Sequence, residues 1–571
     1  MPTYKLTILD AHSNLWKLYN STTYEEATFD NFNPIDHKLL NFDVFSKDPL
    51  TNEIKLVHSV VRNIPHISGI LVLNDQKTYG KTSNSKFYYK CIPDDKRIAP
   101  FLIPYNIKNI SFSKTFVNKY VAFKFTSWTN KHPIGELTNV IGDVNKLENF
   151  YEYQLYCKSL YASLQKFTKA VKTKLRENSE LNFIETINAK YNIEDRRESH
   201  NVYTIDPKNS KDFDDGFSIK QIDNCYIVSI YISNVPIWMN TIDLWTSFSD
   251  RIATIYLPDR KRPMLPNMLS EFLCSLQENQ VRFAFTLDIH VDVNGNIIDY
   301  AFKNTCISVK KNYRYSDDFT NFNDFTTLKK VLLKMNNSKF TSYVEYIRDS
   351  HDVIAYLMIL MNYISAQEFL KYKTGIFRSM KINNNIDVPK YLPNDIGSFL
   401  KLWKSNSSKY VSFDSEKTHD MLKLNEYIHI TSPIRRLVDT LNMLELQHCL
   451  GLMDFTKESY YFHQFWTSIE KLDYINQTMQ SIRKVQNECN ILTKCILEPE
   501  VLGYEYNGYI FDVMNRNDGL YQYIVFISEL KMINKFISYH KLEKFSKHTF
   551  KLYLFEDKDN LKQKVRYEIQ I

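Results

Sequence analysis

Short apolar runs recur in the first quarter of the chain and predict β-strands. They lie at 70–73, 86–92 and 120–125, and polar residues or prolines interrupt the sequence between them. Short, repeatedly interrupted strands with few helical stretches are typical of small β-barrels. We therefore predict barrels between 51 and 146, whereas residues 1–50 show no clear period and stay unassigned.

A helical pattern follows over 147–197, where apolar residues such as Tyr153, Tyr156 and Leu160 recur three or four positions apart. This spacing places them on one face of a helix and predicts a helical connector. Three further segments have helical character: 343–373, 433–450 and 456–492, the last as one long helix or a pair.

Strand patterns return after the connector. The run 226–232 is almost continuously apolar, as in a buried strand, whereas apolar and polar residues alternate over 285–292, as in a strand with one wet face. An Asn294-Gly295 pair comes directly after and predicts a tight hairpin turn into 297–309. Strand-like runs near the end of the chain predict a last small barrel: 508–513, 521–527 and 550–554.

The composition requires a folded chain and is compatible with a nucleic-acid partner. Hydrophobic residues make up 44% of the 571 residues, too many for a disordered chain. There are 72 Lys and Arg against 65 Asp and Glu, so the formal net charge is +7, and aromatic residues make up 14%. Basic charge and aromatic rings both suit nucleic acid, but so small a surplus over the whole chain does not establish that partner.

The cysteines and the longest apolar run favour a soluble protein. Eight cysteines are scattered without a C-x-x-C pair, which favours reduced, buried thiols. Lys5, Asp10 and His12 interrupt the N-terminal residues, which therefore lack the apolar core of a secretory leader. The longest apolar run, 353–364, contains Asn362 and is shorter than the ~20 residues that cross a bilayer. We expect an intracellular, cytoplasmic protein without a membrane partner.

Four aspartates lie close together between two predicted strands: Asp206, Asp212, Asp214 and Asp215. Carboxylates packed this closely repel one another unless a cation neutralises them. Magnesium takes a couple of carboxylates together with water and a substrate phosphate, whereas the spacing fits no frame of an EF-hand calcium loop. The cluster therefore predicts a magnesium site, and a solvated acidic turn is the alternative.

A second motif supplies cations. In Thr431-Ser-Pro-Ile-Arg-Arg436, Pro433 is the favoured first residue of a helix, with Thr431 or Ser432 as its cap. Arg435 and Arg436 beside a helix N-terminus form an arrangement that binds phosphate, and a salt bridge at the helix start is the alternative. Acids for metal ions and arginines for a phosphate together describe metal-assisted hydrolysis of a phosphodiester.

These motifs resemble those of the ribonuclease II and ribonuclease R (RNB) family, which includes the exoribonuclease subunit of the eukaryotic exosome. The family signature I-D-P followed by D-x-D-D is similar to residues 205–207 with 212–215, and T-S-P-I-R-R is unbroken at 431–436. A third block lies between them, with Y-L-P-D-R at 256–260, P-M-L-P at 263–266 and L-C-S-L at 273–276.

The resemblance implies a 3′→5′ exoribonuclease that hydrolyses single-stranded RNA to nucleoside 5′-monophosphates with magnesium, or with manganese in its place. The four aspartates would hold the metal ions, Asp214 would also act in catalysis, and Arg435 would contact the scissile phosphate. Tyr315 would be the active-site tyrosine, although Tyr313 also fits that position. Three side chains would bind the RNA, the first by stacking on a base: Tyr256, Arg260 and Arg436.

The fold class that the resemblance implies is α+β. An RNB catalytic domain would be flanked by small OB-type β-barrels, cold-shock-like before it and one OB barrel after it. The boundaries are 1–50 for an unassigned N-terminal extension, 51–97 and 98–146 for two cold-shock-like barrels, 147–197 for the helical connector, 198–494 for the RNB catalytic domain and 495–571 for the closing OB barrel.

The chain departs from the family's pattern at three places. Leu437 stands where relatives have tyrosine, Ser233-Asn234 stands where they have alanine and aspartate, and Tyr356 stands where many have an acid. None of these removes a predicted metal ligand, so we expect an active enzyme; an inactive RNA-binding regulator of the same fold is the alternative. A DNA substrate rests only on shared phosphodiester chemistry, and membership of a larger RNA-decay complex stays open.

Overall fold

A computed structural model divides the chain into two units, each with hydrophobic cores of its own. The structure describes residues 2–10, 15–48, 51–107, 116–338, 346–383, 388–405, 408–516, 518–557 and 562–570. The first unit comprises Met1–Tyr161, Leu257–Asp259 and Arg483–Ile571, and the second comprises Ala162–Tyr256 and Arg260–Ile482.

A five-stranded sheet occupies the stretch that the sequence left unassigned. Its strands, in the order β3-β2-β1-β4-β5, are β1 (Thr3–Ile8), β2 (Trp16–Asn20), β3 (Glu26–Ala27), β4 (Val44–Lys47) and β5 (Ile54–His58). Leu6, Leu18 and Phe45 are fully buried in its core, and Phe32 packs on it from a connecting segment. The boundary at residue 50 is wrong because β4 and β5 pair across it. The strands are short, and the ring of Phe32 joins their core from outside them. The sequence therefore shows no regular alternation of apolar and polar residues in this stretch.

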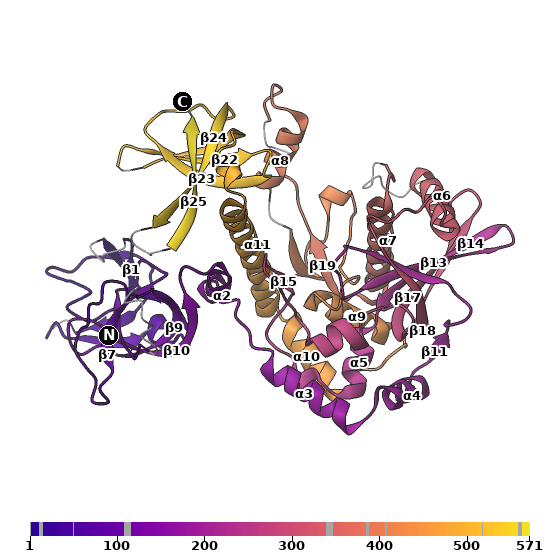
Figure 1. Cartoon of the computed structure of the whole chain (residues 1–571), viewed down its shortest axis with the longest axis horizontal. Coiled ribbons are helices and arrows are strands. Elements are labelled where there is room, and N and C mark those ends of the chain that lie inside the picture. Colours follow the sequence, from indigo (N-terminus) through magenta and orange to yellow (C-terminus); the bar gives the residue numbers. More distant parts are fainter. Residues whose placement is uncertain are drawn as a thin grey trace. The chain divides into compact units, whose positions relative to one another are not determined.

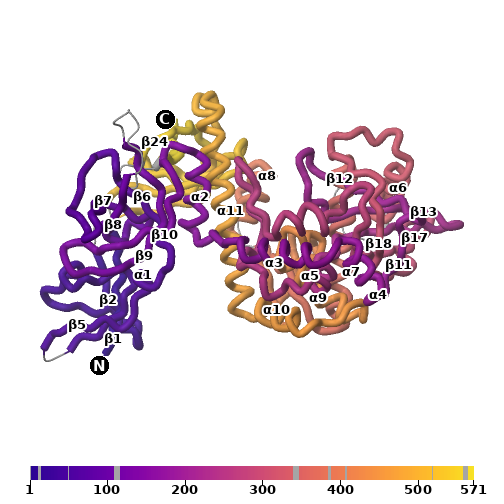
Figure 2. Tube along the Cα trace, turned by 60° about the horizontal axis from the view of Figure 1, so that its bottom comes forward, coloured from indigo at the N-terminus to yellow at the C-terminus, as the bar shows by residue number. Residues whose placement is uncertain are grey.

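The next five strands close a single β-barrel. After the short helix α1 (Val60–Asn63) they are β6 (Ile67–Leu71), β7 (Phe87–Pro93), β8 (Phe101–Tyr105), β9 (Lys119–Ser127) and β10 (Ile134–Asp143). Their closed order is β10-β8-β7-β6-β9, and Figure 2 shows them gathered apart from β1, β2 and β5. The predicted division into two barrels at 97/98 is wrong because β7 and β8 pair across it, Cys91 with Phe101. Apolar runs locate strands but do not identify their partners.

The predicted helical connector is shared between the two units. It contains α2 (Leu147–Cys157), α3 (Gln165–Glu177), α4 (Glu180–Lys190) and the short strand β11 (Ile193–Asp195). Helix α2 belongs to the first unit, and α3 and α4 belong to the second. Ser179 caps α4 by accepting a hydrogen bond from the Asn182 N–H at 3.2 Å.

One sheet organises the second unit (Figure 1). Besides β11 its strands are β12 (Val202–Asp206), β13 (Asp215–Ile222), β14 (Cys225–Ser233), β17 (Val281–Asp292) and β18 (Ile297–Arg314). The order is β11-β18-β12-β13-β14-β17. The last strand of this order, β17, also pairs with β18, so the strands from β18 to β17 form a closed ring of hydrogen-bonded neighbours. The predicted hairpin turn is confirmed: β17 and β18 run antiparallel from it, and Gly295 has a φ of +92°, which suits glycine.

The face of β17 that was predicted to be wet is only partly so: His290 is exposed and Asp292 is half-buried, whereas Thr286 and Asp288 are buried. Asp288 is 5% exposed, and Thr286 is fully buried. The Asp288 carboxylate accepts hydrogen bonds from Arg196 Nη1 at 2.7 Å, from Arg196 Nη2 at 2.5 Å and from Ser229 Oγ at 2.7 Å. A buried charge is tolerated when it is paired and hydrogen-bonded. The polar positions of the alternating pattern therefore form a buried polar layer at Thr286 and Asp288, and they reach solvent only from His290 onward.

Arg196→Met is expected to lower the free energy of unfolding of the second unit by about 3–5 kcal/mol, because it leaves the Asp288 charge buried without its partner. Denaturant unfolding followed by tryptophan fluorescence measures this loss. Arg197→Met is the matched control, since the ion pair of Arg197 with Asp195 is exposed and such pairs contribute less than about 1 kcal/mol. Equal losses in the two variants would contradict the buried charge pair.

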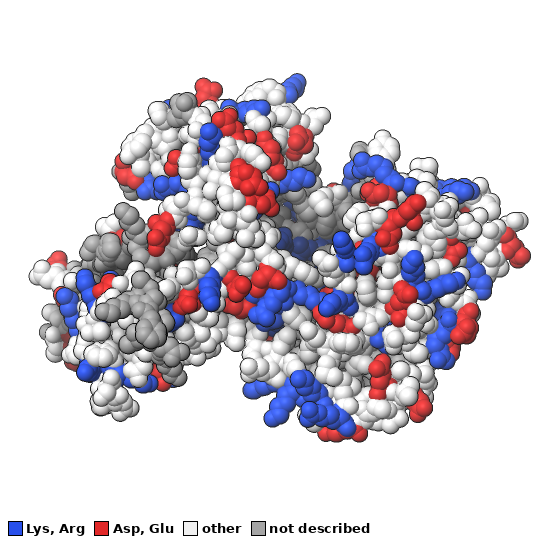
Figure 3. All heavy atoms as spheres, in the orientation of Figure 1, with Lys and Arg blue, Asp and Glu red and all other residues white. Residues whose placement is uncertain are grey.

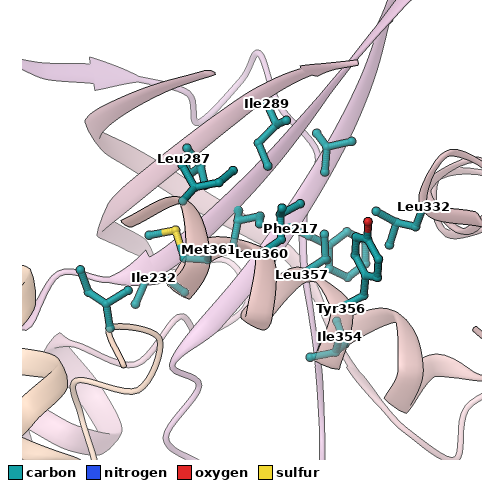
Figure 4. Close-up of a cluster of buried hydrophobic side chains, with 14 of the residues drawn as sticks. Phe217, Ile232, Leu287, Ile289, Leu332, Ile354, Tyr356, Leu357, Leu360 and Met361 are labelled. Carbon is teal, nitrogen blue, oxygen red and sulfur yellow. The ribbon is translucent and has the colours of Figure 1, made fainter. Parts of the chain in front are cut away.

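Helix α7 (Ser350–Tyr372) is the core helix expected from the longest apolar run. Figure 4 shows Leu357 and Leu360 of α7 packed with Phe217 of β13 and Leu287 of β17. By length and composition alone α7 could cross a bilayer, but 67% of its most apolar window is buried inside the protein. Tyr356, which replaces an acid of many relatives, is fully buried in the same cluster.

The second unit contains further helices and two short ladders. The helices are α5 (Val235–Ile242), α6 (Asn323–Ser338), α8 (Asn394–Lys404), α9 (Leu437–Cys449), α10 (Lys457–Thr467) and α11 (Ile469–Leu497), the last of which continues into the first unit. The ladders pair β15 (Ile255–Tyr256) with β16 (Lys261–Arg262) and β19 (Ile376–Ser379) with β20 (Lys409–Ser412). The predicted helical stretch 456–492 is a pair, and 343–345 of another predicted helix lie outside the described residues.

The last strands form a sheet of the first unit. They are β21 (Tyr506–Asn515), β22 (Tyr521–Ile527), β23 (Met532–Ser538), β24 (Lys547–Asp557) and β25 (Lys562–Gln570). Their order is β23-β22-β21-β24-β25, around a core that contains Tyr523, Val525 and Phe550. Each predicted strand of this region falls within one of them. In the described residues, the hydrogen-bonded ladder of the predicted closing barrel is open between β23 and β25.

Candidate active site

Two of the four aspartates form a pair at the ends of neighbouring strands. Asp206 is the last residue of β12 and Asp215 is the first of β13, and the strands pair at Tyr203 and Phe217. Burial raises the pKa of Asp206 to about 8, and the charge of Asp215 adds to this shift. Burial also raises the pKa of Asp215 to about 6, against the opposing effect of Arg435. The pair therefore favours a proton or a cation between its carboxylates.

The loop between these strands is held by the L-C-S-L block. Ser275 Oγ accepts a hydrogen bond from the Phe213 N–H at 3.0 Å and donates one to the Lys211 carbonyl at 2.8 Å. The Leu276 N–H donates to the Phe213 carbonyl at 3.0 Å. The third motif block thus fixes the acidic loop without contributing an acid of its own.

Asp214 joins the acidic loop to the arginine motif. Asp214 is 3% exposed; its Oδ1 accepts the Ile434 N–H at 2.9 Å, and its Oδ2 accepts from Arg435 Nε at 3.1 Å. Burial raises the pKa of Asp214 to about 7, while Arg435 and the Ile434 N–H act in the opposite direction. Arg435 Nη2 also donates to Ser432 Oγ at 2.9 Å. The acidic loop therefore sets the position of the Arg435 guanidinium.

The two arginines precede a helix instead of lying inside its first turn. Helix α9 begins at Leu437, with Arg436 as its N-cap. The predictions that Pro433 is the first helical residue and that Thr431 or Ser432 is the cap are therefore wrong.

A neighbouring extended segment explains this late helix start. The Thr254 N–H donates to the Arg435 carbonyl at 3.0 Å, and the Leu437 N–H donates to the Ile252 carbonyl at 2.9 Å. Ala253 and Arg436 form an antiparallel bridge between these two bonds. Residues 433–435 form only a hydrogen-bonded turn, in which the Arg436 N–H donates to the Ser432 carbonyl at 3.0 Å. The pairing of residues 435–437 with the extended segment delays the regular helix to Leu437.

Arg436 is turned inward rather than toward a ligand. Its Nη2 donates to Asp439 Oδ1 at 2.8 Å, and its Nη1 lies 3.3 Å from His429 Nδ1. Asp439 is fully buried and also accepts the Ser432 N–H at 2.8 Å. The RNA contact of Arg436 stays a prediction; in the structure Arg436, with Asp439, holds the turn that carries Arg435.

Asn362 is a positioning residue of the site that sequence reasoning missed. It lies in α7 and is 2% exposed. Its Oδ1 accepts the Ile430 N–H at 2.8 Å, and its Nδ2 donates to the Tyr427 hydroxyl at 3.0 Å. Both partners come just before the arginine motif. A single amide inside the longest apolar run was the signal that could have identified it.

The remaining aspartate faces a lysine. Asp212 Oδ1 lies 2.8 Å from the Nζ of Lys261, which is the first residue of β16. In the part of the chain that the structure describes, no three His, Cys, Asp or Glu side chains are arranged to hold a metal ion. Two of the four predicted metal ligands thus contact cations of the chain: Asp212 contacts Lys261, and Asp214 contacts Arg435. Asp206 and Asp215 remain as candidate ligands of a metal ion.

This pair suits a hard divalent cation. Its donors are carboxylate oxygens, and Asp206 Oδ2 is buried without a hydrogen-bond partner among the described residues. Magnesium needs only one or two carboxylates besides water and substrate phosphates. A bound cation would also relieve the repulsion by Asp215 that contributes to the raised pKa of Asp206.

The two candidate tyrosines have different surroundings. The Tyr315 N–H donates to the Asp206 carbonyl at 3.1 Å, and the Tyr315 ring stacks on His351 with the centroids 3.6 Å apart. Tyr313 packs in the hydrophobic cluster against Phe322, with the centroids 4.8 Å apart. The geometry therefore favours Tyr315 over Tyr313 as the active-site tyrosine.

The short ladder of β15 and β16 carries the other predicted RNA contacts. Tyr256 is 44% exposed and pairs in register with Lys261, the residue that contacts Asp212. Arg260, just before β16, is also exposed. An aromatic ring and a cation thus stand on the same element that reaches the acidic loop.

In EDTA, the stability of the second unit is expected to fall as the pH rises. Asp206 and Asp214 have pKa values raised to about 8 and about 7, against roughly 4 in an unfolded chain. Between these values the folded chain binds more protons than the unfolded chain, so the free energy of unfolding decreases with pH. Thermal unfolding between about pH 5 and about pH 8 measures this trend.

Two variants isolate the source of that pH dependence. Asp206→Asn should flatten the profile, whereas Asp292→Asn, in an exposed turn where the carboxylate accepts backbone hydrogen bonds, should leave its slope unchanged. A profile that Asp206→Asn leaves unchanged would contradict the raised pKa of Asp206. The comparison is made between variants because burial lowers the pKa values of His419 and His429, and these histidines act on the slope in the opposite direction in every variant.

Part of this site lies in a stretch that matches a known family model. Residues 194–324 match the family model of the RNB domain. Over these residues the chain resembles the RNB family. A second model, the Dis3-like cold-shock domain 2, matches residues 88–153, which include β8 to β10 of the closed barrel. The predicted resemblance to the RNB family and the predicted fold class are confirmed.

Individual proteins extend the comparison. Ribonuclease R of Ureaplasma parvum serovar 3 is 31% identical over 223 residues, which cover 38% of this chain and 29% of that protein. The structure of Mycoplasma genitalium RNase R in complex with ribose-methylated single-stranded RNA has a TM-score of 0.70 at 16% identity, covering 99% of this chain and 100% of that chain. Yeast Ssd1, a pseudonuclease, has a TM-score of 0.57 at 12% identity, covering 93% and 78% of the two chains. At these identities the two structures establish a shared fold, and the match to the curated Ribonuclease R spans less than a third of that protein.

The RNB domain match contains most of the site but not all of it. Asp206, Asp215, Lys261 and Tyr315 lie within the matched residues, whereas the arginine motif at 431–436 lies beyond them. The hydrogen bonds from the arginine motif to Asp214 join the two parts of the site within the second unit.

Proposed function

We propose that the chain is a metal-dependent 3′→5′ exoribonuclease, which hydrolyses single-stranded RNA to nucleoside 5′-monophosphates. The observation that carries the proposal is the contact of Asp214 with Arg435, which places a guanidinium beside the acidic loop. The direction of degradation and the product follow from the resemblance to the RNB family, and the solved relative bound to single-stranded RNA supports that substrate.

The side chains of the site have separate tasks in this proposal. Asp206 and Asp215 would hold magnesium, or manganese, and a bound divalent ion polarises a phosphate and makes water more acidic. Arg435, whose side chain is 43% exposed, offsets the negative charge that develops on the phosphate in the transition state. Asp214 accepts from Nε and Ser432 accepts from Nη2, so both orient Arg435, and the exposed part of the guanidinium would contact the phosphate.

Other groups of the second unit would bind the RNA without reading its sequence. The exposed ring of Tyr256 can stack on a base, a contact worth ~1–3 kcal/mol. Figure 3 shows Lys and Arg gathered over α3, and cations attract a phosphate backbone of any sequence. The exposed cations of α3 are Lys166, Lys169, Lys172 and Arg176.

The direct test uses purified chain, magnesium and 5′-labelled single-stranded RNA. The RNA should shorten stepwise from its 3′ end, EDTA should stop the reaction, and a 3′ label should appear first as mononucleotide. RNA that is bound but never shortened, with either magnesium or manganese, would reject the proposal. The same assay with DNA tests the alternative substrate.

An RNA-binding protein without nuclease activity is the second candidate. It is favoured by the contacts of Asp212 with Lys261 and of Asp214 with Arg435, because cations of the chain compete with metal ions for these carboxylates. The yeast pseudonuclease has a similar fold. Against this candidate, the chain retains all four aspartates and both arginines, which an inactive descendant has no chemical reason to keep.

A further inference from the structure

Lys261 is a cation of the chain at the edge of the acidic loop. Its Nζ lies 2.8 Å from Asp212 Oδ1 and 2.9 Å from Glu271 Oε1. The three side chains are mostly shielded from water, with 22% of Lys261, 10% of Asp212 and 15% of Glu271 exposed. An ammonium that bridges two shielded carboxylates is held more firmly than a surface ion pair.

Two neighbouring elements and one distant loop fix this bridge. Lys261 is held by the ladder of β15 and β16, and Glu271 lies in the π-helical turn Met268–Leu273. Asp212 belongs to the loop that Ser275 holds through Lys211 and Phe213. Because each partner is anchored by its own backbone contacts, the ammonium has a defined position beside the aspartates.

Burial lowers the pKa of the Lys261 ammonium, and its hydrogen bonds to Asp212 and Glu271 outweigh that effect, so the pKa is raised above its usual range. Lys261 therefore stays charged at neutral pH. Asp212 meets a permanent positive charge, whereas Asp206 has a buried oxygen without a hydrogen-bond partner among the described residues.

We propose that Lys261 withholds Asp212 from the metal, so that the divalent ion is bound by Asp206 and Asp215 alone and the chain itself supplies the cation at Asp212. This inference rests on the proposed function, since it concerns the metal that the proposed reaction requires. It makes Lys261 a positioning residue that sets how many divalent ions the acidic loop binds.

Titration calorimetry of Mn²⁺ into the full chain, stripped of metal with EDTA and free of RNA, tests this role. Lys261→Met frees Asp212, so the variant should bind an additional ion or bind Mn²⁺ about 10-fold more tightly. Lys261→Arg keeps the positive charge and should behave as the wild type. The matched control is Lys303→Met, which removes a lysine that also bridges two carboxylates, those of Glu194 and Asp288.

Asp212→Asn tests the same idea from the other partner. In the wild-type background it should leave Mn²⁺ binding unchanged, whereas Asp206→Asn should weaken it. In the Lys261→Met background it should abolish the gain. The comparison of Asp212→Asn with Asp206→Asn in the wild-type background also tests the inference if Lys261→Met fails to fold. Equal losses of Mn²⁺ affinity in these two variants would overturn the inference.

The remaining outcomes are separable from those of the proposed function. An unchanged or weakened isotherm in Lys261→Met would show that Lys261 is only a structural ion pair and would overturn the inference, even if RNA is shortened normally. If the wild type shortens no RNA, the proposed function fails; a gain of Mn²⁺ binding in Lys261→Met would still support the inference, and no gain would overturn it.

Discussion

Asp214→Asn is expected to reduce the shortening of single-stranded RNA by about 10³-fold, while RNA binding persists. The Asp214 carboxylate accepts from both the Ile434 N–H and Arg435 Nε. The asparagine amide has the same size but only one acceptor oxygen, and that oxygen carries no charge. Either this oxygen or the NH₂ group then faces the guanidinium, so Arg435 loses its charge-assisted hydrogen bond. Single-turnover assays with 5′-labelled RNA measure the rate, and a filter-binding assay measures RNA affinity.

Asp292→Asn is the matched control for this change. It is the same substitution in the same unit, in the β17–β18 turn where Asp292 accepts hydrogen bonds from the Asn294 and Asn296 N–H groups. This variant should cleave RNA at the wild-type rate. Undiminished cleavage by Asp214→Asn would remove Asp214 from the catalytic assignment, and equal losses in both variants would indicate a general effect on folding.

Arg435→Lys is expected to lower the cleavage rate by about 10²-fold with little change in RNA affinity. Lysine keeps the positive charge but offers a point charge in place of the planar fork. Its single nitrogen cannot occupy the two separate positions, Nε and Nη2, from which Arg435 donates to Asp214 and to Ser432. The loss should therefore appear in kcat more than in KM, because the charge that attracts the phosphate is retained.

A conservative change elsewhere controls for the loss of a guanidinium. Arg197→Lys removes the hydrogen bonds of Arg197 Nε and Nη2 to Asp195 at an exposed position of the second unit and should leave the rate unchanged. A wild-type rate in Arg435→Lys would mean that a positive charge alone is sufficient at this position. A loss confined to KM would instead make Arg435 a residue for RNA binding.

The residues of the site could be located from the sequence because their chemistry restricts residue type. Asp206, Asp214 and Arg435 stand in short motifs whose spacing is tied to metal and phosphate binding, and the structure brings the three together. Asn362 and Lys261 carry no motif. Their roles arise from contacts with residues far away in the chain, at Ile430 and Asp212, which local patterns do not record.

The pairing of elements was the part that local patterns could not provide. The apolar run 86–92 predicted β7, but it does not show that β7 pairs with β8 in one closed barrel, and no predicted strand covered β8. The start of α9 moved to Leu437 because an extended segment that ends near Thr254 competes for the same backbone groups. Hydrogen-bond partners at long range override cap and proline preferences that act only within one turn.

The sequence by itself determined the acidic loop, the arginine motif and the hairpin at Gly295, because each depends on side chains within a few positions of one another; the α+β class came from the resemblance to the RNB family. Only the tertiary structure decided that Asp214 faces Arg435, that Asp212 faces Lys261, and that Asp288 is buried with Arg196. Charge pairs form between whichever elements the fold brings within hydrogen-bond reach, and that choice is made by packing of the whole unit rather than by neighbouring residues.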